Sequence, residues 1–144
     1  MARTILIVGA VAWLLAGAAS FVLAETGTGW LLSLLPPLAI DADAVGGALT
    51  ALALTMVVTG TAHLFVVAGL RERRRWATSA GALLASVLAV ACVALAAAAI
   101  SSAVREPAYA LPLLGAALVA GSAATGYVLA AVGLARELGS GSVS

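Results

Sequence analysis

The sequence predicts an all-α integral membrane protein, an antiparallel four-transmembrane-helix bundle. Apolar residues make up 64% of the chain and charged residues only 9%, and the mean hydropathy is +1.19. Soluble domains are nearer to half apolar and about a quarter charged. A chain of 144 residues folded in water would have too few polar groups to cover this much apolar surface. We therefore expect one membrane domain over residues 1–138.

Composition also narrows the classes of function. The net charge of +1 offers no basic field for nucleic acid. Lys, Asn and Gln are absent, which we interpret as a GC-rich coding bias that favours a prokaryotic source and an inner or plasma membrane. Cys92 is the only cysteine, so one chain can build neither a disulfide nor a thiolate metal site. We expect Cys92 to be buried and inert.

The first predicted span covers about residues 5–24, a run without charge that is long enough to cross the hydrocarbon layer. A secretory signal is the alternative, because Arg3 precedes the run and Val22, Leu23 and Ala24 resemble a cleavage site. The apolar run exceeds a usual signal core, so the sequence favours a retained helix.

The stretch from Glu25 to Val45 interrupts the apolar pattern with acidic residues and glycines. Its apolar part, residues 30–40, contains Pro36 and Pro37 and is too short to span. We expect a short helix lying in the membrane interface between the first two spans. A re-entrant segment that faces a cavity is the alternative.

Three further spans are predicted from the remaining apolar runs, followed by a polar tail. Their approximate ranges are residues 46–70, 77–101 and 108–135 for the spans and 139–144 for the tail. Arginine placement orients them. Six of the seven arginines fall on one side of the predicted membrane, and only Arg105 falls on the other. The positive-inside rule then places both termini and the turn at residues 71–75 in the cytoplasm.

Helices in lipid associate by close packing of small residues, because lipid tails are as apolar as leucine. Each predicted span carries small residues at a spacing of four or eight, which we expect to face its neighbours. These residues are Gly9 and Gly17, then Gly47, Ala51, Thr55 and Thr59 with His63 at the end of the same row, then Gly81, Ala85 and Ala89, and finally Ala117, Gly121 and Thr125.

One polar residue from each span falls at a similar depth. With about 1.5 Å of rise per residue, Trp13, His63, Ser86 and Tyr127 each lie about 12 to 15 Å from the cytoplasmic end of their helices. Polar atoms are costly to leave unpaired in hydrocarbon, so we expect these four and Thr59 to form one hydrogen-bonded layer. The layer is either a candidate ligand-binding pocket or a device that fixes helix register.

Several kinds of chemistry lack the residues they need. No carboxylate lies within a predicted span, which argues against proton-coupled transport and leaves His63 without an acidic partner. The single histidine could hold haem only if a second chain supplied the other ligand, and no set of zinc ligands is apparent. No catalytic residue and no metal ligand is therefore predicted, and an enzyme is the less favoured class.

Arg71, Arg73, Arg74 and Arg75 are candidate ligands for anionic lipid headgroups. Topology alone also explains four arginines in one turn.

Two functional hypotheses follow. The first is a non-catalytic accessory or structural subunit that packs against a membrane protein complex or against itself in an oligomer. The second is binding or transport of a small lipophilic molecule, such as a quinone, a lipid or haem, in the polar layer around His63.

Overall fold

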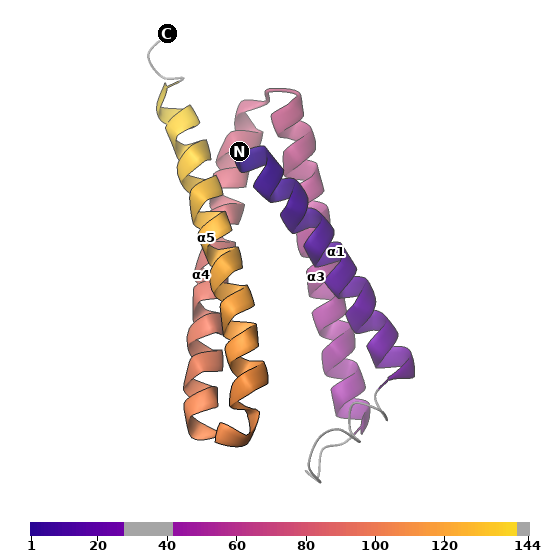
Figure 1. The fold of residues 1–144 in the computed structure, drawn as a ribbon. Helices are drawn as coiled ribbons and strands as arrows, with labels where there is room; N and C mark the ends of the chain where they lie inside the picture. The colour runs from indigo at the N-terminus through magenta and orange to yellow at the C-terminus, as the bar shows by residue number, and fades with distance from the viewer. Residues whose placement is uncertain (28–41, 141–144) are drawn as a thin grey trace. The chain divides into compact units, whose positions relative to one another are not determined.

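A computed structural model describes residues 1–27 and 42–140 of the chain. The described chain is helical, with four long helices and one short 3-10 helix (Figure 1). These elements are α1 (Ala2–Thr26), α3 (Ala42–Arg71), α4 (Arg75–Arg105), η1 (Pro107–Tyr109) and α5 (Ala110–Ser140). All four long helices are long and apolar enough to cross a membrane, as the sequence predicts. The interfacial helix expected at residues 30–40 lies outside the described residues.

Each helix extends a few residues beyond the predicted apolar span. The α4 helix runs through both Arg75 and Arg105, and α5 continues to Ser140, past the predicted start of the tail at residue 139. Polar side chains at the ends of a helix can reach water without breaking its hydrogen bonds. Pro107 begins η1, a position where its missing N–H is no loss.

The described chain divides into two compact units, and each is treated by itself. The first unit is Ile7–Phe65, and the second comprises Met1–Leu6 with the chain from Val66 onward. Helices α1 and α3 therefore contribute to both units.

Two glycines bring α1 and α3 together in the first unit. A Cβ atom added to Gly17 would lie 3.1 Å from the Ala53 carbonyl oxygen, and one added to Gly60 would lie 3.2 Å from the Ala10 carbonyl oxygen. Residues later in α1 thus meet residues earlier in α3, so the two helices are antiparallel. The four residues share a spacing of seven on each helix, which keeps them on one face.

The small-residue row predicted for α3 is wrong in its direction. Gly47, Ala51 and Thr55 are exposed, whereas Ala53 and Gly60 are buried. A spacing of four overshoots one helical turn by about 40° per step, so a long row winds off the contact face. His63, at the end of that row, is the member that the structure buries.

In the second unit α4 and α5 form an antiparallel hairpin and pack along their length (Figure 1). The row predicted on α4 is confirmed, since Gly81, Ala85 and Ala89 are buried. A Cβ on Gly81 would lie 3.0 Å from both Leu134 Cδ1 and Val66 Cγ1. These contacts close a buried cluster at one end of the unit, formed by Leu6, Val66 and Leu134.

Bulky apolar side chains cover the outside of the helices. Val104 and Leu118 are each 77% exposed, and most other valines and leucines of the described spans also lie on the surface. In water such a surface would drive aggregation, whereas lipid is a favourable solvent for it. The arrangement is that of a multi-pass membrane protein with small residues inside and large aliphatic residues outside.

Candidate functional site

His63 is a fully buried polar side chain in the first unit, with an exposed fraction of 0%. Its Nδ1 lies 2.7 Å from the carbonyl oxygen of Thr59, one turn earlier in α3. A carbonyl can only accept, so Nδ1 carries the proton and donates it, and the neutral imidazole then presents Nε2 as an acceptor. Helix α3 thus positions the ring through its own backbone.

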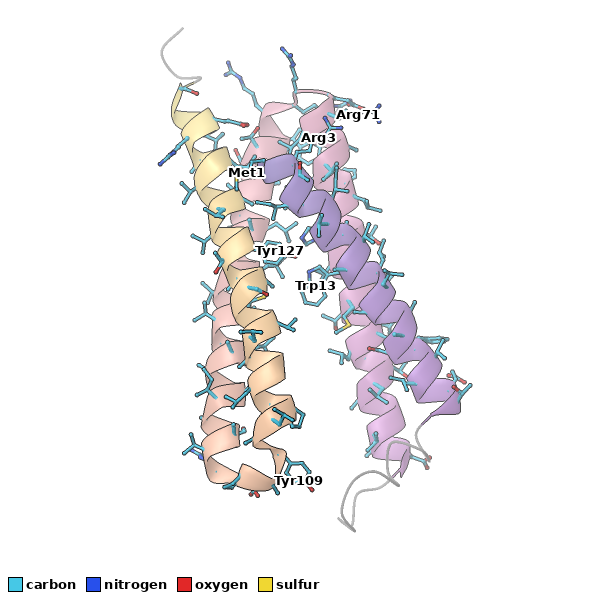
Figure 2. All side chains as sticks on the ribbon, in the orientation of Figure 1. Met1, Arg3, Trp13, Arg71, Tyr109 and Tyr127 are labelled. Atoms are coloured by element: carbon cyan, nitrogen blue, oxygen red, sulfur yellow. The ribbon has the colours of Figure 1, made fainter. Side chains whose placement is uncertain are left out.

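Trp13 and Thr59 also belong to the first unit, and both are half-buried. The Thr59 hydroxyl donates to the Thr55 carbonyl at 2.8 Å within α3. The structure therefore links His63 to Thr59 through a main-chain carbonyl and commits the Thr59 hydroxyl to the helix. Figure 2 shows Trp13 partway along α1.

Ser86 and Tyr127 belong to the second unit. Tyr127 is buried on α5, with 5% of the residue exposed, whereas Ser86 lies on the exposed side of α4. The Ser86 hydroxyl donates to the Ala82 carbonyl at 2.8 Å. The hairpin therefore does not bury Ser86 beside Tyr127, and the layer that joins all four helices stays a prediction.

Several other hydroxyl groups of the described spans behave as Ser86 does. Thr50, Thr55, Thr61, Ser122 and Thr125 each donate to a carbonyl three or four residues earlier in the same helix. No buried side-chain nitrogen or oxygen among the described residues lacks a hydrogen-bond partner. Most of these hydroxyls are thus satisfied within their own helix, whereas Ser20 Oγ in α1 donates to Met56 Sδ in α3 at 3.8 Å.

An open apolar groove lies on the α4–α5 hairpin and was not predicted from the sequence. Its volume is about 500 Å³. Five of its nine lining residues are small, namely Ala96, Ala97, Gly121, Ala124 and Thr125, and the others are branched aliphatic residues. The small residues at these positions could have indicated the groove in the sequence, but alanine is so common in the chain that they do not stand out from the other alanines.

The basic turn, residues 71–75, joins α3 to α4 and is exposed throughout. Two hydrogen bonds close the end of α3, from Arg74 N to Gly69 O at 3.0 Å and from Arg73 N to Leu70 O at 3.2 Å. This is the Schellman pattern, in which one residue adopts the left-handed conformation. Arg73 does so, with φ of 55°.

The described residues contain no group of three or more His, Cys, Asp or Glu side chains placed to hold a metal ion. Cys92 is buried, as expected. Comparison of the chain with protein-family models, with curated proteins and with solved structures finds no match.

Proposed function

We propose that this protein is a non-catalytic membrane subunit that holds a transmembrane helix of another chain in the groove on its α4–α5 hairpin. The open apolar groove is the observation that carries the proposal. The other chain belongs to a larger membrane complex or is a second copy of this protein. Both termini and the basic turn face the cytoplasm in this proposal.

The lining of the groove favours a helix over a small molecule. Small side chains such as Ala97 and Gly121 let a neighbouring backbone approach closely, which is how helices associate where no hydrophobic driving force acts. Ligand pockets instead place a few polar groups that fix the orientation of the ligand. The groove has one side-chain oxygen, and the Thr125 hydroxyl that carries it already donates to the Gly121 carbonyl at 3.0 Å.

Two glycines of α5 supply a test with a matched control. A Cβ atom on Gly121 would meet nothing within 4 Å, and the same holds for Gly115, which lies outside the groove lining. The Cβ atom of Gly121→Leu or Gly115→Leu would therefore meet nothing in the hairpin, but only Gly121→Leu places its side chain in the groove.

The assay is the mass of the particle purified from native membranes in a mild, lipid-retaining detergent. We expect the wild type and Gly115→Leu to elute as complexes and Gly121→Leu as the isolated chain. Mass spectrometry of the complex then separates a partner from a second copy. A wild-type protein that elutes as a clean monomer refutes the proposal, as does an intact Gly121→Leu complex.

Binding of a lipophilic molecule near His63 is the second candidate. The observation that favours it is the fully buried imidazole of His63 within a membrane-spanning helix. Ionisable groups at such positions mark functional sites in many membrane proteins. The purified protein would then carry a chromophore or an extractable lipophile, and His63→Leu would lose it with the helices intact. A preparation without either would exclude this function.

A further inference from the structure

The second unit gathers the arginines of three separate segments at one end. Arg3 lies in the first turn of α1, Arg71 ends α3 and Arg136 lies in the last turns of α5. Figure 2 shows Arg3 and Arg71 at the same end. Packing holds these segments together, since a Cβ on Gly133 would lie 3.6 Å from Ala2 Cβ.

Within this end the basic turn supplies most of the charge. Arg74 Nε pairs with Glu72 Oε2 at 2.6 Å, and both side chains remain more than half exposed. Arg71, Arg73 and Arg75 make no ion pair with any residue that the structure describes. Three guanidinium groups are thus left to act on something outside the unit.

The backbone conformation of Arg73 also indicates a binding site in the turn. Its φ of 55° is the left-handed conformation that glycine adopts without penalty and that a side chain disfavours. Residues held in such conformations collect at binding sites, where the side chain has a use. Topology explains the number of arginines in the turn, but it gives no reason for an arginine at this particular position.

The depth of the turn identifies the partner. Arg71 and Arg75 are the terminal residues of two candidate spans, so the turn between them lies at the level of the headgroups. Trp76 follows directly, is 41% exposed and lies against Gly69 at the end of α3. Tryptophan at a helix end is typical of the membrane–water interface.

We infer that Arg71, Arg73 and Arg75 bind the phosphate of an anionic phospholipid headgroup. A guanidinium matches two phosphate oxygens with parallel hydrogen bonds, which makes arginine the preferred residue for this group. Arg74 is left out of this set, because it donates its Nε–H to the Glu72 carboxylate, which also offsets its charge. The site is independent of the groove on α4–α5 and of the assembly proposed for it.

Lipid retention by the purified full chain tests the inference. The protein in mild detergent receives equal amounts of phosphatidylglycerol and phosphatidylcholine, and native mass spectrometry counts the lipids that stay bound. We expect the wild type to retain phosphatidylglycerol selectively. Equal retention of the two lipids would overturn the inference.

Variants locate the site. Each basic residue near an anionic surface is worth about a fivefold change in affinity, so replacing Arg71, Arg73 and Arg75 with Gln should weaken retention on the order of a hundredfold. Arg105→Gln, at the other end of α4, is the matched control and should change nothing. A loss of about fivefold in the control, which is the effect of one removed charge, would show general charge attraction and overturn the assignment.

Arg73→Gly separates binding from folding. It removes one guanidinium and places glycine at the left-handed position, so the fold gains stability while retention should fall about fivefold. Unchanged retention in a folded Arg73→Gly protein would exclude Arg73 from the site. Inorganic phosphate in millimolar excess should leave the lipid bound, and displacement would identify a free-anion site instead.

Discussion

Replacing Gly60 with alanine tests the helix contact on which the first unit depends. The new Cβ would lie 2.7 Å from Leu14 Cγ, 2.9 Å from Leu14 Cδ2 and 3.2 Å from the Ala10 carbonyl oxygen. The Cγ atom is a branch point that cannot move without the whole side chain, and the carbonyl belongs to the backbone of α1. The added methyl must therefore push the two helices apart or force Leu14 out of its rotamer.

The magnitude follows from two opposing terms. Overpacking a close contact lowers the free energy of unfolding by about 1 to 3 kcal/mol. Alanine in place of glycine within a helix raises it by about 1 kcal/mol. Gly47→Ala on the same helix should show only the gain from alanine, since nothing lies within 4 Å of its Cβ. The free energy of unfolding of Gly60→Ala should thus lie about 1 to 3 kcal/mol below that of Gly47→Ala.

The measurement is unfolding by sodium dodecyl sulfate in mild detergent micelles, followed by tryptophan fluorescence. Leu14→Ala in the Gly60→Ala background removes both atoms that the methyl meets first. The penalty of Gly60→Ala should then shrink, and a double-mutant cycle should give a favourable interaction energy. If Gly60→Ala is as stable as Gly47→Ala, the close approach of α1 to α3 is refuted.

Three further predictions use the same titration. Arg73→Gly should raise the free energy of unfolding by up to about 1 kcal/mol, because glycine fits a φ of 55° without strain; a loss of stability would contradict this. The free energy of unfolding of Gly69→Ala should lie about 1 to 3 kcal/mol below that of Gly47→Ala, because its Cβ would lie 2.7 Å from Ala77 Cβ; equal stability of the two variants would mean that α3 and α4 are further apart at the turn. The third prediction compares two polar residues. Ser86→Ala should change the free energy of unfolding by less than about 0.5 kcal/mol, since the exposed Ser86 hydroxyl bonds its own helix, whereas His63→Leu should lower it by about 0.5 to 1.5 kcal/mol, because the hydrogen bond from Nδ1 to the Thr59 carbonyl is lost. A larger loss in Ser86→Ala than in His63→Leu would show that Ser86 has an interhelical role.

The existence of the four helices was readable from the sequence because it depends only on the length and charge of apolar runs. The helix ends were less readable. Arg75 and Arg105 remain helical although both lie outside the predicted spans. Hydropathy marks where lipid ends, whereas a helix ends where its hydrogen bonds do, as at Pro107.

Which face of a helix turns inward was predictable over short distances only. The row from Gly81 to Ala89 covers two steps of four residues and is buried as expected. The row from Gly47 to His63 covers four steps, and by its end the direction has turned by about 160°. His63 and Tyr127 were identified because buried polar atoms are few, but the exposed position of Ser86 depends on rotation about α4, which depth alone does not specify.

The groove depends on register, which the sequence does not state. Its lining joins residues of α4 to residues of α5, and their alignment is set by the short connection from Glu106 through η1. A different length of connection would bring other side chains of the two helices together. Sequence reasoning can list small residues on each helix, but it pairs them only once this connection is known.

Packing by small residues also explains where recognition should occur. Because alanine and glycine fill many of the contacts within each unit, larger side chains such as Leu118 lie on the surface. Hydroxyl groups such as that of Thr125 bond their own helices and offer little to a ligand. The remaining features that can recognise a partner are the shape of the helix surfaces and the charge at the helix ends. The groove is such a shape and the basic turn is such a charge, so we propose a binding site at each. His63 differs from these groups because it is a buried polar side chain other than a hydroxyl. The search for a bound lipophile therefore tests a third site, beside the groove and the basic turn.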